Sequence, residues 1–85
     1  MQEKYTEKMI TYLPVIRQSL KMTQKQLATK LGVSRQTIVV FENRKQTLPW
    51  SVYLALVFLF QQYEISKDLL DKLELFSIEF VRDDL

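Results

Sequence analysis

The chain contains neither cysteine nor histidine in its 85 residues. Without cysteine it can form no disulfide framework and no thiolate metal site. Without histidine it lacks the commonest general base and the commonest metal ligand of proteins. Any chemistry would have to rest on carboxylates, lysines and hydroxyls, and the sequence shows no nucleophile–base pair or metal cluster built from these. We therefore expect no enzymatic activity, no bound metal, no cofactor and no small-molecule substrate.

Glycine and proline are also scarce, with one glycine and two prolines in the whole chain. Because these residues interrupt helices and mark turns, their scarcity favours an all-α fold with short connections. A chain of this length forms one domain with a marginal core, which a partner chain could stabilise. We expect a single domain over residues 1–85, with its core at about residues 9–63. Residues 64–85 would form a C-terminal helix or strand that serves dimerisation.

Long hydrophobic runs are missing as well. The longest, residues 52–60, has nine residues, whereas a membrane-spanning helix needs roughly 20. The first eight residues are polar and carry charges of both signs, unlike a secretory signal or an organellar transit peptide. We therefore expect a cytoplasmic protein without a membrane partner.

The formal net charge is only +2, but the charges are unevenly distributed. Residues 17–47 contain seven basic residues and the single acid Glu42, whereas residues 61–85 contain seven acids and three basic residues. This pattern favours a middle region that faces a polyanion and a tail that faces elsewhere. A chance cluster on a solvated surface explains the basic residues equally well at this point.

The hydrophobic pattern predicts a first helix over about residues 7–21. Its apolar side chains recur at helical spacing on one face, and they are Met9, Leu13, Ile16 and Leu20. Pro14 lies inside this pattern. We expect it either to kink the helix or to stand in the first turn of its well-ordered part.

Two short helices follow, over about residues 24–31 and 35–43. Thr23 and Ser34 are good N-cap residues for them, and Gly32 stands where a left-handed C-cap is expected. Two short helices joined by a tight turn near a glycine form a helix-turn-helix.

The residue types along this helix pair match what a helix-turn-helix requires. Ala28 is small where the next helix must approach closely. The shared core would contain Leu27, Leu31, Val33, Ile38 and Phe41. The side chains between these positions would face outward, and they are Arg35, Gln36, Thr37, Val39 and Val40. A helix whose N-terminal half enters the major groove of DNA needs polar side chains at its start.

The remaining sequence predicts two further elements. Residues 50–63 are apolar almost all round and should form a helix that is buried on most faces. Ser66 can cap a fifth helix, which places on one side Leu69, Leu70, Leu73, Phe76, Phe80 and Val81. Residues 73–82 also alternate in polarity, so an extended strand there is the alternative, and periodicity does not decide between the two.

The segment TQKQLATKLGVSRQTIVVFENRK, residues 23–45, resembles the phage-repressor-like family of bacterial helix-turn-helix regulators (Cro/repressor type, XRE type). The elements TQ, LA, LGVSRQTI and FEN-RK occur in order and at the family's spacing. The resemblance extends over about residues 13–60. It implies a compact five-helix domain that binds double-stranded DNA in a sequence-specific manner and regulates transcription.

The resemblance also implies which residues read bases. Arg35 and Gln36 match the positions that touch base edges, where Arg suits guanine and Gln suits adenine. Thr37 would touch a base or a phosphate. Val40 lies one turn further along, where an apolar side chain can pack on a thymine methyl group. For Val39 and Val40, burial in the core is an equally good interpretation.

Four other residues match phosphate contacts of the family, which fix register without reading sequence. They are Gln24, Asn43, Arg44 and Lys45. Gln24 would also buttress the recognition helix. The family usually has glycine where Arg44 stands, so the turn after the recognition helix should be strained or differently shaped.

The resemblance implies, in addition, a structural pair between Arg17 and Glu42 that ties the first helix to the end of the recognition helix. The resulting hypothesis is a transcriptional repressor that acts as a homodimer on a two-fold site. The dimer would form through the fourth and fifth helices, because their apolar surface exceeds what one small core absorbs. The alternative is an antitoxin-type or antirepressor-type module whose main contact is a protein partner.

Overall fold

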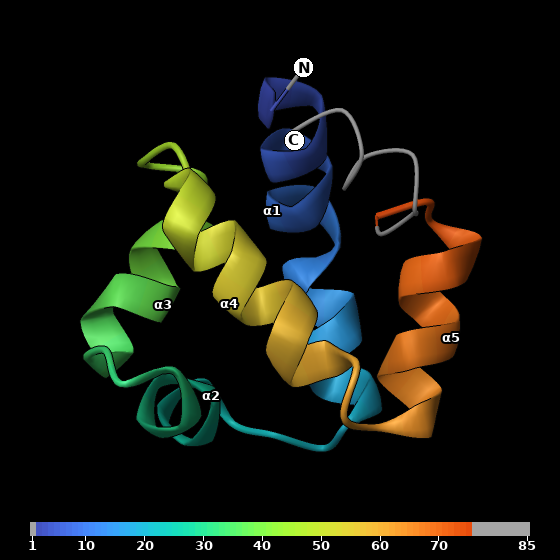
Figure 1. The fold of residues 1–85 in the computed structure, drawn as a ribbon. Coiled ribbons are helices and arrows are strands. Elements are labelled where there is room, and N and C mark those ends of the chain that lie inside the picture. Colours follow the sequence, from blue (N-terminus) through green and yellow to red (C-terminus); the bar gives the residue numbers. More distant parts are fainter. Residues whose placement is uncertain (1, 76–85) are drawn as a thin grey trace.

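The computed structural model describes residues 2–75, which form five helices and no strand (Figure 1). The all-α fold expected from the sequence is therefore confirmed. The helices are α1 (Gln2–Ser19), α2 (Gln24–Leu31), α3 (Arg35–Glu42), α4 (Trp50–Phe60) and α5 (Glu64–Lys72). Most of the segment 73–82, for which a helix and a strand were both considered, lies outside the described residues, as do Phe76, Phe80 and Val81.

The helices α1 and α4 pack against each other in the middle of the molecule. The α2–α3 pair lies on one side of them and α5 on the other (Figure 1). All five helices contribute fully buried apolar side chains, among them Leu13, Leu27, Ile38, Phe60 and Leu70. Burial of each such side chain contributes about 1.5–3 kcal/mol. The α2–α3 pair is thus held by a core that it shares with the other three helices.

The first helix is longer than the sequence pattern predicts. It begins at Gln2 and continues through Pro14, so the prediction that its ordered part starts at the proline is wrong. Proline removes one helical hydrogen bond. Burial on both sides of the proline, with Met9 and Leu13 before it and Ile16 after it, offsets that loss.

The junction between α4 and α5 also differs from prediction. The helix α4 ends at Phe60 rather than at Tyr63, and the N-cap of α5 is Tyr63, so Ser66 does not cap α5. Ser66 is instead fully buried inside α5, and its hydroxyl donates to the carbonyl oxygen of Phe60 at 2.6 Å. A serine that would serve as a cap in isolation here satisfies the C-terminal backbone of the preceding helix.

Tyr53 connects α4 to the residues that follow α5. Its ring is fully buried and stacks on Trp50 with 4.7 Å between the ring centroids. Its hydroxyl donates to the carbonyl oxygen of Leu75. Burial raises the pKa of the Tyr53 hydroxyl well above its ordinary value, and neighbouring Tyr5 raises it further. The group therefore remains a hydrogen-bond donor at any physiological pH.

Four of the helices end in the same left-handed turn, although only one of them has a glycine there. The residues with positive φ are Lys21 (57°), Gly32 (76°), Arg44 (60°) and Glu74 (56°). In each case the next amide bonds back across the last helical turn, as from Met22 to Arg17 and from Leu75 to Leu70. This is the Schellman motif, in which a left-handed residue with a side chain costs roughly 1–2 kcal/mol.

We predict that Lys21→Gly stabilises the protein by about 0.5–1 kcal/mol, because it removes the strain of a left-handed lysine. Urea unfolding followed by circular dichroism measures this change. The matched control is Lys67→Gly, since Lys67 is also exposed but lies inside α5. That variant should lose about 0.5–1 kcal/mol. Equal destabilisation by both substitutions would contradict the prediction.

Candidate nucleic-acid interface

The ends of α2 and α3 are fixed by their own sequence. Thr23 and Gln26 form a capping box, with Gln26 N donating to Thr23 Oγ1 (3.0 Å) and Thr23 N donating to Gln26 Oε1 (2.8 Å). Ser34 caps α3 by accepting from Thr37 N at 3.2 Å. Gly32 has the left-handed conformation expected between them. The predicted caps and turn are therefore confirmed.

The two helices share an apolar contact surface that sets their crossing. Leu27, Ile38 and Phe41 are buried, whereas Leu31 and Val33, which were expected in the same core, are only half-buried. The side chains of Leu31 and Val33 lie toward the edge of the pair. The small side chain of Ala28 is 2 % exposed, consistent with its expected place beside the approaching helix.

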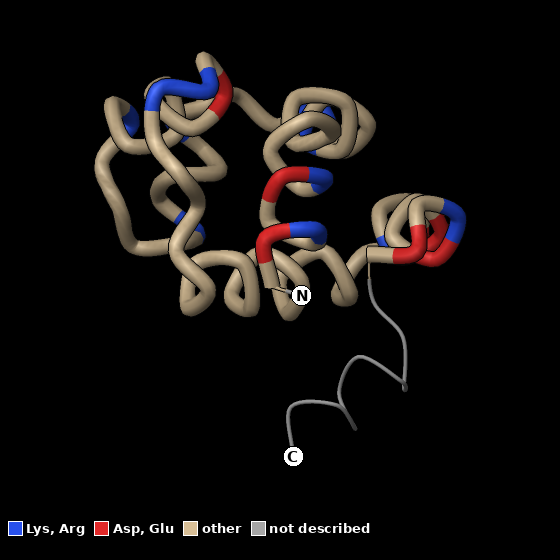
Figure 2. Tube along the Cα trace, turned by 90° about the horizontal axis from the view of Figure 1, so that it is seen from above, with Lys and Arg blue, Asp and Glu red and all other residues tan. Residues whose placement is uncertain are grey.

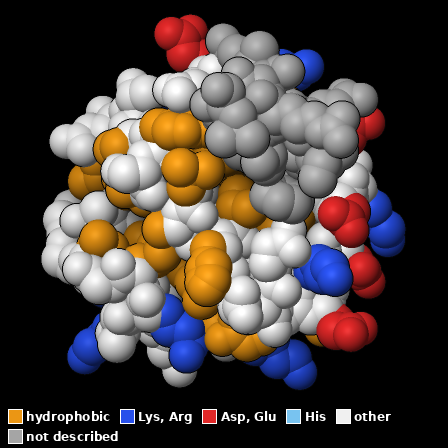
Figure 3. Space-filling model, in the orientation of Figure 1, with side chains coloured by type: hydrophobic (Ala, Val, Ile, Leu, Met, Phe, Trp, Pro, Cys, Tyr) orange, Lys and Arg blue, Asp and Glu red, His pale blue; other side chains and the backbone are white. Residues whose placement is uncertain are grey.

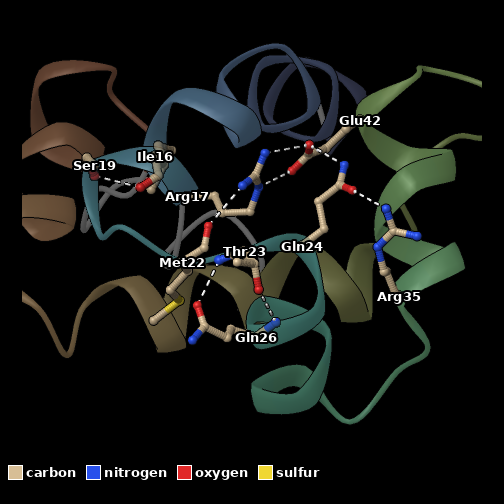
Figure 4. A network of polar contacts seen from close by, with 9 residues as sticks. All are labelled: Ile16, Arg17, Ser19, Met22, Thr23, Gln24, Gln26, Arg35 and Glu42. Carbon is tan, nitrogen blue, oxygen red and sulfur yellow. Dashed lines mark hydrogen bonds and ion pairs between the residues drawn. The ribbon is translucent and has the colours of Figure 1, made fainter.

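An ion pair joins α1 to the end of α3 (Figure 4). Arg17 donates to both carboxylate oxygens of Glu42, from Nε at 2.8 Å and from Nη2 at 3.1 Å. The remaining Nη1 donates to the carbonyl oxygen of Met22 at 2.9 Å, in the turn before α2. The two side chains are only 12 % and 7 % exposed. The pair expected from the family resemblance is confirmed.

Gln24 continues this network toward the start of α3 (Figure 4). Its Nε2 donates to Glu42 at 3.0 Å, and its Oε1 accepts from Arg35 Nη2 at 3.4 Å. One amide side chain thus contacts residues at both ends of α3. The bond to Arg35 is long, so it directs the guanidinium without confining it tightly.

The outward face of α3 presents polar groups at its start and apolar groups further along. Arg35 and Gln36 are exposed, and Thr37 is half-buried with its hydroxyl 3.0 Å from that of Ser34. Val39 and Val40 are half-buried, so they are neither core residues nor freely exposed. Of the residues expected to read bases, Arg35, Gln36 and Thr37 thus form the first turn of α3, and Val40 lies one turn beyond Gln36.

The loop after α3 carries the other expected contacts. Asn43, Arg44 and Lys45 are all exposed. The predicted strain at Arg44 is confirmed by its positive φ, and its Nη1 donates to Thr11 Oγ1 of α1 at 3.0 Å. Sequence reasoning did not identify Thr11, because nothing in its local pattern signals a partner 33 residues away.

The electrostatic asymmetry seen in the sequence has a spatial counterpart. Basic positions are distributed over the α2–α3 side of the molecule, whereas α5 mixes both signs (Figure 2). The only acid within residues 17–47, Glu42, is neutralised by Arg17. The outward charge around α3 is consequently positive, as a surface that faces phosphates requires.

Residues 16–49 match the family model described as helix-turn-helix. The matched segment includes Arg17, both helices of the pair and the loop after α3. No curated protein and no solved structure matches the chain. This segment is therefore similar to the helix-turn-helix of DNA-binding transcriptional regulators, in agreement with the Cro/repressor-type resemblance seen in the sequence.

Residues 2–75 lack the features of a membrane span and of a metal site. None of their helices is long and apolar enough to cross a membrane. No group of three or more acidic side chains lies close enough together in this region to hold a metal ion.

We predict that Glu42→Ala destabilises the fold by about 3–5 kcal/mol, because it leaves the half-buried Arg17 guanidinium without its counter-charge. The double variant Arg17→Met/Glu42→Met should recover most of the loss, since it removes both charges together. Urea unfolding of the two variants beside the unmodified chain measures both values. A loss below about 1 kcal/mol in Glu42→Ala would mean that the pair behaves as an exposed surface ion pair.

Proposed function

We propose that α3 is a recognition helix that enters the major groove, and that the protein is a sequence-specific repressor. The observation that carries this proposal is the first turn of α3, where side-chain hydrogen bonds orient the N-terminal residues of the helix. Arg35 and Gln36 are exposed there, and the Gln24 amide oxygen accepts a long hydrogen bond from the Arg35 guanidinium that directs it without confining it. Arg can donate two hydrogen bonds to guanine O6 and N7, and Gln can pair with adenine N6 and N7. Each such pair contributes about 1–3 kcal/mol of discrimination.

Further along α3, the readout becomes apolar. Thr37 shares its hydroxyl with the N-cap Ser34, so it has limited capacity for a second partner. Val40 is half-exposed one turn beyond Gln36, and its methyl groups suit a thymine methyl. The proposed reading surface is therefore concentrated in the first turn of α3, with Val40 as an apolar extension.

Backbone contacts would flank this surface on both sides. Gln24 uses one amide hydrogen for Glu42, which leaves the second for a phosphate oxygen. On the other side, Asn43, Arg44 and Lys45 lie exposed in one loop. Such contacts set the register of a recognition helix without reading sequence.

A dimer completes the proposal. Two copies related by a two-fold axis would place their recognition helices about 34 Å apart on successive turns of the major groove. Repression by occupying a promoter requires only this specific binding. A target of this kind is a two-fold symmetric site in double-stranded DNA.

Selection from random duplex DNA, followed by binding at two salt concentrations, tests the proposal. We expect a recovered motif with two-fold symmetry. Gln36→Ala should relax the preference at one base position per half-site by about 1–3 kcal/mol and leave the salt dependence unchanged. Lys45→Ala should weaken binding to all sequences alike and lower the salt slope by about 1.

Matched controls are Gln2→Ala and Lys67→Ala, since both residues are exposed outside the helix-turn-helix. Neither control should change base preference or salt slope. Binding without a recoverable motif would reject sequence-specific readout, and a reversal of the two effects would reject the assigned roles.

A further inference from the structure

Arg44 keeps a strained backbone conformation just after α3. Its φ is 60°, and two hydrogen bonds fix it there, from Arg44 N to Phe41 O at 3.0 Å and from Lys45 N to Val40 O at 3.1 Å. Glycine would adopt this conformation without steric cost. Strain that a fold retains at one position gives a physical reason to look for a function of the side chain there.

The side chain of Arg44 is held as well as its backbone. Its Nη1 donates to Thr11 Oγ1 of α1 at 3.0 Å, across 33 residues of sequence. The other left-handed residues that carry side chains are Lys21 and Glu74. Within residues 2–75, no hydrogen bond or ion pair joins either of their side chains to another element. Of these three strained residues, Arg44 is thus the one whose side chain has a fixed partner.

Thr11 is well suited to hold a guanidinium. Its hydroxyl donates its single proton to the carbonyl oxygen of Glu7, one turn earlier in α1, at 3.0 Å. The Thr11 oxygen therefore offers only lone pairs to a neighbour, and Arg44 supplies the donor that they need. Since a threonine within a helix has few rotamers, α1 itself defines the position of this acceptor.

The contact brings the loop after α3 against the side of α1. A hollow of about 240 Å³ lies between them. Arg44 and Lys45 border it and are both exposed, whereas Glu7 is the one acid that borders it, so the hollow is positive on balance. Its remaining lining residues are Thr6, Ile10, Gln46 and Thr47. A phosphate that approaches this edge of α3 would meet a local excess of positive charge.

The face of the molecule over α4 offers a phosphate no comparable site. Apolar side chains gather along α4 in the middle of this face, and Lys and Arg side chains lie mostly toward its margins (Figure 3). Leu54 and Phe58 are 42 % and 62 % exposed, so the prediction that α4 is buried on most faces holds only for its inner side. A polyanion gains little from such an uncharged surface.

We propose that Thr11 is a positioning residue for DNA binding, which holds the Arg44 guanidinium so that its other N–H groups bind one phosphate of the DNA backbone. A guanidinium that uses one donor on Thr11 has enough others for a two-point contact with phosphate oxygens. Because the side chain is already ordered, less conformational entropy is lost on binding. This inference deepens the phosphate contacts of the proposed function and rests on them. It adds α1 to the surface that determines affinity, through a side chain that the usual glycine at this position would lack.

Binding to two labelled DNA duplexes, measured by fluorescence anisotropy at several salt concentrations, tests the inference. One duplex carries the most enriched sequence from the selection, and the other carries an unrelated sequence. Arg44→Gly should weaken binding to both about tenfold and lower the salt slope by about 1, because one charged contact is lost. The same variant should unfold at a higher urea concentration, because the strain is removed. These opposite effects on affinity and stability distinguish a binding role from a structural one.

Substitutions of Thr11 separate positioning from charge. Thr11→Val removes the hydroxyl and should weaken binding about two- to fivefold with an unchanged salt slope, because Arg44 keeps its charge but is no longer held. Thr11→Ser keeps the hydroxyl and should bind like the unmodified chain. In the Arg44→Gly background, Thr11→Val should have no further effect, because the group that it positions is absent.

Each substitution has a matched control. Thr29 is exposed, and its hydroxyl donates to the carbonyl oxygen of Lys25, one turn earlier in α2, at 3.0 Å. Thr29→Val therefore removes the same kind of hydroxyl and should leave the affinity for DNA unchanged. Lys21→Gly removes a positive charge and a left-handed strain, as Arg44→Gly does, but outside the proposed interface. It should leave the salt slope unchanged.

The inference is overturned by unchanged affinity in Thr11→Val or in Arg44→Gly, or by an equal loss from Thr11→Val with and without Arg44. Any of these results would keep the proposed function if a motif is recovered and Gln36→Ala relaxes it. Conversely, equal affinity for both duplexes, with the expected losses in Arg44→Gly and Thr11→Val, would reject sequence-specific readout and keep the role of Thr11.

Discussion

The bidentate contact between Arg17 and Glu42 is the constraint on which the candidate nucleic-acid interface depends. It spans 25 residues of sequence and fixes the end of α3 against α1, while the third Arg17 donor holds the turn before α2. Gln24 then links Glu42 to Arg35, because its amide group donates to the Glu42 carboxylate and accepts from the Arg35 guanidinium. Contacts that lead to the Glu42 carboxylate thereby connect the two ends of α3. Loss of either charge would disturb the surface that is proposed to read bases, because the remaining partner would be unpaired.

Local sequence is sufficient for the helix-turn-helix, but not for the contacts that hold it. The caps at Thr23 and Ser34 and the turn at Gly32 follow from residues within four positions, so they could be predicted from sequence. Ser66 was wrongly assigned as a cap because its partner is the end of another helix. The contact between Arg44 and Thr11 had no sequence signal, and the pair of Arg17 and Glu42 was accessible only through family resemblance. The assignment of base and phosphate contacts stays a prediction.

The two sides of α4 show that apolar composition alone overestimates how much of a helix is buried in the core. Nearly every residue of this helix is apolar, which indicates burial but not what provides it. The structure covers one side with α1, α2 and α5 and leaves Leu54 and Phe58 open. In a domain of this size a single layer of helices cannot cover both sides of its central helix. An apolar composition therefore predicts that a helix contributes to the core, but not which of its sides is buried.

The left-handed residues at the helix ends also bear on how the protein meets its target. At Lys21 and Arg44 a side chain occupies a backbone conformation that glycine would usually fill, and the hydrogen bonds across each helix end hold it there against the preference of the residue. These two strained corners lie at the two boundaries of the α2–α3 pair. Lys21 is not among the residues proposed to contact DNA. The stability of that junction can therefore be changed without altering the proposed interface.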